Sequence, residues 1–217
     1  MAETALAERA EAERAPSEGS RSARPPPDRE RLRRAVAEML AALGHREQGE
    51  LEGTPERVAD AWIDELLAGE GLDPLEPLRA STILLGPGAH GAVVLRKLRV
   101  ATMCPHHLLP SLGSATIAYL PRERAAGLGA LAQVVDVLSR RLTLQETLGE
   151  AIASTLLEGL EAEGALCHLT LRHSCFSARG EREAEATVET LALAGSFADR
   201  DRALALGLLG GDVERRG

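Results

Sequence analysis

Residues 103–110 read M-C-P-H-H-L-L-P and place one thiol and two imidazoles within four residues, at Cys104, His106 and His107. Thiolate and neutral imidazole are ligand types that zinc prefers, and a catalytic zinc takes three protein ligands and keeps a fourth position for water. A third ligand must therefore come from a distant part of the chain, which constrains the fold. Taken alone, this stretch is explained about equally well by a metal site and by a buried structural cysteine with a capping histidine.

The third ligand is expected from residues 173–175, His-Ser-Cys, far along the chain. If these residues continue a strand, alternation places His173 and Cys175 on one face. Both clusters follow apolar, strand-like stretches, at 93–98 and 166–171, so we expect them on adjacent strands. Together they predict a metal site with spare histidines that move protons. Cys167 is more typical of a small core residue.

Composition narrows the class of protein. The chain has 217 residues, 44% of them hydrophobic, which is enough for one domain with tails. Its net charge of −8 argues against a nucleic-acid binder, which would show a basic face. Three cysteines form no disulfide framework, and no apolar run is long enough to span a bilayer. We expect a cytoplasmic protein whose partners are small molecules or proteins, with no nucleic acid and no membrane.

Hydrophobic periodicity predicts an α+β fold. A helical period begins at Glu30 and stops at Gly44, and a second helix begins with Thr54 as N-cap and Pro55 and ends at Gly69. Further helices are expected at 128–141 and 144–160, a short strand at 81–85, and longer strands at 92–101, 115–120, 166–171 and 185–193. This order favours an antiparallel sheet with a helical pair. The domain is expected at 30–198, with a disordered tail at 1–29 and a C-terminal tail or loose helix at 199–217.

Four ordered motifs resemble the GTP cyclohydrolase I family, from about residue 32 to residue 197. They are G-T-P-E-R-V-A at 53–59, C-P-H-H-L-L-P at 104–110, R-R-L-T-L-Q-E at 140–146, and H-S-C at 173–175 followed by R-G at 179–180. Several motifs in the right order are a specific signal. The resemblance implies the tunnelling fold, in which subunits assemble into a homo-oligomeric ring, for example a decamer, with active sites between subunits.

The resemblance also implies roles for single residues. Cys104, His107 and Cys175 would hold Zn²⁺, while His106 and His173 would donate and accept protons beside the substrate. Four more residues would bind a guanine nucleotide or derivative: Gln145 and Glu146 at the base, and Arg57 and Arg179 at the phosphates. The reaction implied is hydrolysis of the guanine imidazole ring at C8, which in the family converts GTP to 7,8-dihydroneopterin triphosphate. Without the resemblance, Gln145 and Glu146 are typical of a solvated helix start.

The chain departs from the family where the triphosphate is held. The family has a Ser-Lys pair and a following Arg in the segment that here reads G-L-G-A-L-A-Q, residues 127–133, and a lysine where this chain has Asp60. Pro105 replaces a glutamate and Ser114 a lysine. We therefore expect a guanine substrate that carries fewer phosphates or is modified, and a product that stops at a ring-opened pyrimidine is an open alternative. Four other cations could bind phosphate in place of the missing side chains, but they are more typical of a solvated surface. They are Lys97, Arg99, Arg122 and Arg124.

Two further functions stay open at this point. One is another tunnelling-fold enzyme acting on a pterin or deazaguanine, which would bind a base without releasing formate. The other is a non-catalytic ring subunit that binds a pterin. The complete set of metal ligands argues against the second, because a subunit freed from catalysis has no chemical need for them.

Overall fold

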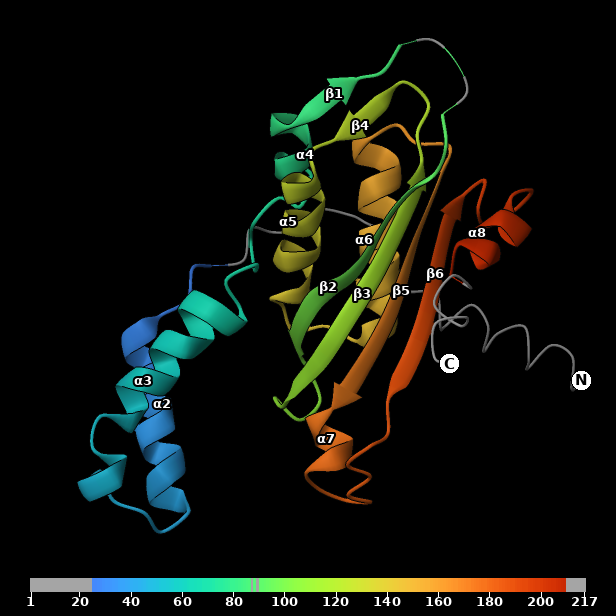
Figure 1. Ribbon diagram of the computed structural model, residues 1–217. Coiled ribbons are helices and arrows are strands. Elements are labelled where there is room, and N and C mark those ends of the chain that lie inside the picture. Colours follow the sequence, from blue (N-terminus) through green and yellow to red (C-terminus); the bar gives the residue numbers. More distant parts are fainter. Residues whose placement is uncertain (1–24, 87, 89, 210–217) are drawn as a thin grey trace, which may run out of the picture.

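The computed structural model describes residues 25–86, 88 and 90–209. Its main elements are a four-stranded antiparallel sheet and two helices that cover one face of it (Figure 1). The sheet has the order β2-β3-β5-β6, with β2 at Val93–Met103, β3 at Pro110–Leu120, β5 at Gly164–His173 and β6 at Val188–Gly195. The antiparallel α+β architecture expected from the sequence is confirmed.

Helices α5 (Leu128–Ser139) and α6 (Gln145–Gly159) pack on the sheet and enclose the main core. Their apolar faces carry Leu131, Val134 and Ile152, which are at most 1% exposed. The facing strands contribute side chains of alternating positions, as a pleated sheet requires. These are Ala115, Ile117, Tyr119, Ala165, Cys167, Leu169 and Leu171.

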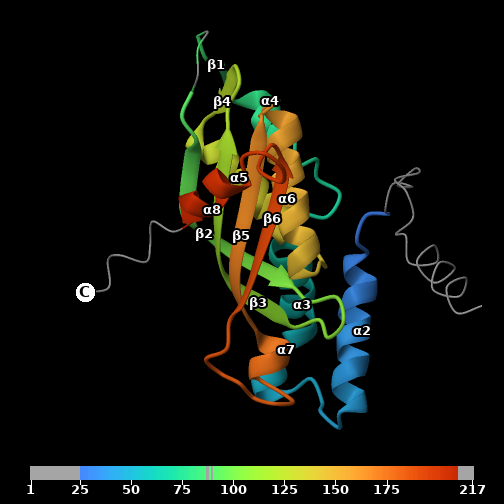
Figure 2. The same cartoon turned by 90° about the vertical axis from the view of Figure 1, so that its right-hand side faces the viewer.

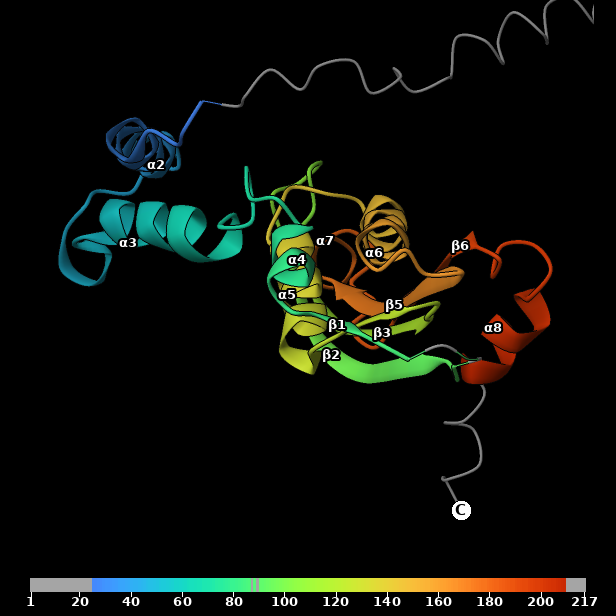
Figure 3. The same ribbon diagram turned by 90° about the horizontal axis from the view of Figure 1, so that it is seen from above.

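Helix α8 (Arg202–Leu209) packs against the opposite face of the sheet. It buries Ala205 against Ala118, Leu166 and Phe197, all 0% exposed. Seen from above, α8 lies away from the α5 and α6 layer (Figure 3). Residues 199–209, assigned to a C-terminal tail by the sequence, thus include a packed helix, and residues 210–217 lie outside the described residues.

The N-terminal helices form an arm beside the sheet (Figures 1 and 3). Helix α2 (Arg29–Ala42) is capped by Asp28, whose Oδ1 accepts from the Arg31 backbone N–H at 2.9 Å. A short 3₁₀ turn, η1 (Gly49–Leu51), leads into helix α3 (Thr54–Asp60), which packs on α2. Helix α3 continues directly as a π-helical segment, η2 (Ala61–Leu66). The expected N-cap at Thr54 was wrong by one position, because Gly53, with φ of 70°, takes the cap. Residues 1–24 of the expected N-terminal tail lie outside the described residues.

A small ribbon closes one end of the domain. Strand β1 (Thr82–Leu84) pairs with β4 (Arg124–Ala126), and helix α4 (Glu76–Ala80) precedes it. The ribbon and the short helix α7 (Ser174–Ser177) lie at opposite ends of the sheet (Figure 2). Among the described residues, no helix is long and apolar enough to cross a membrane.

Two strand predictions need correction. Strand β3 begins at Pro110, not at residue 115, and pairs with β5 from Ser111 opposite His173 to Leu120 opposite Gly164. The expected strand through residues 173–175 was wrong, because β5 ends at His173 and Ser174 begins the helical turn α7. Strand alternation therefore does not determine where Cys175 points.

Candidate metal centre

One imidazole and two thiols converge where the β2–β3 turn meets α7. The ligand atoms of Cys104, His107 and Cys175 all lie within 4.8 Å of one another. Cys104 Sγ is 3.9 Å from His107 Nδ1, so Nδ1 is the ring nitrogen of His107 that faces this thiol. Cys104 is 8% exposed, whereas the His107 ring is open to solvent.

A tight turn gives Cys104 and His107 their positions. The Cys104 N–H donates to Leu109 O at 3.0 Å, and the Leu108 N–H donates back to Cys104 O at 2.9 Å. Leu108 adopts a left-handed φ of 54°, a conformation that non-glycine residues seldom take. The turn folds residues 104–109 back on themselves, so that a cysteine and a histidine three positions apart face the same point.

The donor set fits a catalytic zinc site. Two thiolates and one imidazole make three ligands, and the exposure of His107 leaves a side open for a fourth. Burial raises the pKa of the Cys175 thiol, and the neighbouring Cys104 raises it further. Two thiols this close resist ionising together unless a cation compensates their charge, and metal coordination deprotonates such a thiol. The chemistry of the site thus matches a soft divalent cation.

His173 stands beside this group at the end of β5, and both of its ring nitrogens are hydrogen-bonded. Nε2 lies 2.7 Å from Gln145 Oε1, and Nδ1 lies 2.9 Å from Ser111 Oγ. Burial lowers the pKa of His173, and the nearby Glu146 carboxylate opposes that shift. The ring is therefore fixed in place by two neighbours from different elements, β3 and α6.

Gln145 is placed differently from the sequence expectation. It is only 3% exposed, and its amide nitrogen donates to Leu169 O at 3.3 Å, to Val188 O at 3.0 Å and to Thr190 Oγ1 at 3.1 Å. Its amide oxygen accepts from His173. Both polar atoms of Gln145 are therefore engaged inside the subunit, and its amide oxygen orients His173.

The remaining predicted residues divide into two groups. His106, Glu146 and Arg179 are exposed near the thiols and His173: the His106 ring lies edge-on to that of His107 at 6.3 Å, and Arg179 Nη1 donates to His107 Nε2 at 3.1 Å. Arg57 belongs to the arm, where its Nη2 donates to Thr54 Oγ1 at 3.0 Å, and α3 lies apart from α7 (Figure 1). Within one subunit, Arg57 is not brought to the site.

Ser111 is a site residue that the sequence analysis missed. It lies 1% exposed at the start of β3, directly opposite His173. The expected strand began only at residue 115, so the pairing that places Ser111 against His173 was not foreseen. Extending the strand back to Pro110, the residue after the turn, would have revealed it.

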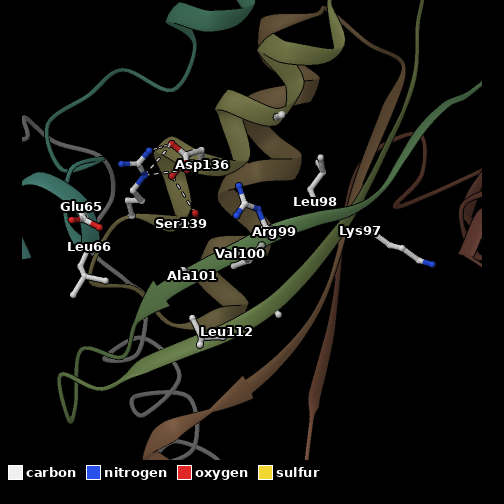
Figure 4. Close-up of a pocket in the computed structure, with 13 residues that line it drawn as sticks. Glu65, Leu66, Lys97, Leu98, Arg99, Val100, Ala101, Leu112, Asp136 and Ser139 are labelled. Atoms are coloured by element: carbon white, nitrogen blue, oxygen red, sulfur yellow. Dashed lines mark hydrogen bonds and ion pairs between the residues drawn. The ribbon is translucent and has the colours of Figure 1, made fainter. Parts of the chain in front are cut away.

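A hollow of the described residues lies elsewhere. It has a volume of about 890 Å³ and lies between β2, η2 and α5 (Figure 4). Arg140 Nε bonds the Asp136 carboxylate at 3.0 Å on one wall, while Lys97 points away from the other labelled side chains. None of the three convergent ligands lines it. Its charged lining residues include Glu65 and Arg99, and it is separate from the convergent thiols and imidazole.

Comparisons with known proteins point to one family. The family model described as GTP cyclohydrolase I matches residues 32–207. The chain is 44% identical to GTP cyclohydrolase 1 of Leifsonia xyli subsp. xyli over 173 residues, covering 79% of this chain and 90% of the relative. It is 39% identical to that of Chromobacterium violaceum, covering 79% and 82%, and 35% identical to that of Wolinella succinogenes, covering 76% and 85%.

Among solved structures, the apo archaeosine synthase QueF-Like aligns with a TM-score of 0.40 at 18% identity, over 50% of this chain and 97% of that chain. This likeness is too slight to carry an argument. The sequence relatives and the family model carry the assignment by themselves, because they span most of both chains. The chain belongs to the GTP cyclohydrolase I family.

Proposed function

We propose that the protein is a zinc-dependent cyclohydrolase that opens the imidazole ring of a guanine compound by hydrolysis at C8. Membership of the family makes it a hydrolase of cyclic amidine C–N bonds. The observation that carries the zinc proposal is the convergence of Cys104, His107 and Cys175 within 4.8 Å. These three residues would hold a zinc ion, and such an ion would lower the pKa of a water to about 7 and so supply a nucleophile at neutral pH.

Proton transfer and binding of the base are assigned to three side chains of this chain. His106 is exposed, and none of the described residues hydrogen-bonds its ring, so both of its nitrogens are free to pass a proton to the guanine imidazole. Both ring nitrogens of His173 are engaged inside the subunit, Nε2 by Gln145 and Nδ1 by Ser111, so we assign it proton exchange at Nδ1 only when its contact with Ser111 opens. The exposed Glu146 carboxylate is a suitable acceptor for two N–H groups of the guanine edge.

A ring of subunits is part of the proposal. Arg57 belongs to α3 in the arm, and α3 lies apart from α7, which carries Cys175 (Figure 1). If Arg57 binds substrate, it does so in the site of a neighbouring copy of the chain. A homo-oligomer with active sites between subunits is therefore what the position of Arg57 favours.

The substrate is proposed to carry fewer phosphates than GTP, or a modified base. Three phosphate-binding side chains of the family are replaced at Gly129, Ala130 and Gln133, and Asp60 is paired with Arg29. Each lost charge-assisted hydrogen bond is worth about 1.5–3 kcal/mol, so the losses amount to orders of magnitude in affinity for a triphosphate. Of the expected cations, only Arg179 stands at this subunit's own metal centre.

The test is a parallel assay of zinc-replete protein with GTP, GMP, guanosine and 8-oxo-guanine nucleotides. Formate release and product mass report hydrolysis at C8. Turnover of a guanine compound with fewer phosphates or an oxidised base, lost in His106→Ala, is the expected result. Efficient conversion of GTP to a pterin would overturn the substrate proposal while supporting the zinc chemistry. Base binding without hydrolysis would instead favour the alternative of a different pterin or deazaguanine enzyme on this fold.

A further inference from the structure

Four linked contacts determine where the proton of neutral His173 lies. The chain of contacts begins at the carbonyl oxygens of Leu169 and Val188, which only accept hydrogen bonds. They require the NH₂ group of Gln145 to face them, so the orientation of this amide follows from its partners. Its Oε1 must then face His173.

The next step fixes the tautomer of the imidazole. Gln145 Oε1 has no hydrogen to give, so at 2.7 Å His173 Nε2 must be the donor and must carry the proton. In the neutral ring Nδ1 is then an acceptor. The group 2.9 Å away is the Ser111 hydroxyl, which therefore donates its hydrogen to Nδ1.

Burial makes the Ser111 contact consequential. Ser111 is 1% exposed, so water does not replace its hydroxyl at Nδ1. It is also too buried to touch a substrate itself. We propose that Ser111 is a positioning residue, which holds the catalytic imidazole of His173 in one orientation and one tautomer by donating to Nδ1.

This inference rests on the proposed function, because that function uses His173 and Ser111 would hold His173 in its working orientation. It predicts that Ser111→Ala lowers kcat by about 10- to 100-fold, the range expected when an orienting hydrogen bond is lost. KM and the zinc content stay within about twofold of wild type, because Ser111 contacts neither substrate nor the ligand atoms. Ser111→Thr keeps the hydroxyl and restores most of the rate.

Ser114→Ala is the matched control. Ser114 lies on the same strand but pairs with Arg99 and Thr170, away from His173, and its loss leaves kcat unchanged. Equal kcat values for Ser111→Ala and wild type would overturn the proposal. So would a fall in Ser111→Ala that Ser111→Thr fails to restore while zinc content and folding are intact.

Neutron diffraction from crystals of the perdeuterated full chain tests the geometry without any turnover. The expected nuclear density shows deuterium on His173 Nε2, none on Nδ1, and the Ser111 deuterium directed at Nδ1. Deuterium on Nδ1 with Nε2 bare, or a Ser111 hydroxyl directed elsewhere, would refute it. If no guanine compound is hydrolysed but the expected density is found, the proposed function fails while the assignment of the Ser111 contact stands.

Discussion

Replacing Gln145 by leucine removes the buried side-chain hydrogen bonds that join α6 to β5 and β6. The substitution deletes the acceptor of His173 and the donor to two strand carbonyls, all within a residue that is 3% exposed. A buried polar group left unpaired costs about 1–3 kcal/mol, and the added apolar burial of leucine offsets part of this, so we expect a loss of about 2–4 kcal/mol in the free energy of unfolding. Leucine and glutamine have similar helix propensities, which keeps the backbone contribution small.

The assay is urea unfolding followed by circular dichroism at one fixed protomer concentration, since any oligomer makes apparent stability concentration-dependent. Glu150→Gln is the control, because Glu150 is exposed on the same helix and its change should stay within about 0.5 kcal/mol. A Gln145→Leu protein as stable as this control would refute the view that the buried hydrogen bonds of Gln145 stabilise the fold.

Three further predictions concern the metal, the sheet and the core. Cys175→Ala should reduce the zinc content of purified protein to near zero by elemental analysis while the fold persists by circular dichroism; full zinc content would exclude Cys175 as a ligand. Gly113→Ala should abolish soluble expression, because its Cβ would lie 2.0 Å from Thr170 O. The matched change Gly129→Ala meets nothing within 4 Å and should stabilise α5 by about 0.5–1 kcal/mol in urea unfolding. Equal behaviour of the two variants would contradict the β3–β5 register. Burial raises the pKa of Cys167 to about 12. Above about pH 9 the unfolded chain therefore loses a proton that the folded chain keeps, and this thiol lowers stability by up to about 1.4 kcal/mol per pH unit. Cys167→Ala should make the fall between about pH 8 and 10.5 shallower by that amount in urea titrations, and an unchanged slope would contradict the assignment.

Local patterns predicted the elements better than their ends. The helical period of α2 was visible because its apolar residues recur every three to four positions, and Gly44, with φ of 83°, lies just past its end as expected. The start of β3 was not visible, since Pro110, Ser111 and Gly113 weaken any strand signal. Residues 110–114 are a strand because they pair with β2 on one side, from Met103 opposite Pro110, and with β5 on the other, from His173 opposite Ser111.

Residue type pointed to a cluster of thiols and imidazoles, but not to its surroundings. Cys104, His106 and His107 were candidates from their spacing, and the family resemblance selected His107, whose ligand atom does converge with those of Cys104 and Cys175. That Cys175 reaches them from a helical turn, and that Gln145 points inward, depend on where β5 ends and how α6 packs. Sequence motifs record which residues are present, and they leave open which atoms those residues present to a ligand.

Opening of the guanine imidazole ring at C8 is the reaction proposed for this chain. The most direct measurement follows the label from guanine nucleotides carrying ¹³C at C8, incubated with zinc-replete protein and analysed by mass spectrometry. We expect the label to leave the intact ring and to appear in a formamide or in formate, and we expect Cys175→Ala to abolish this. Label retained in an intact purine for every guanine compound offered, with zinc bound and the protein folded, would contradict it.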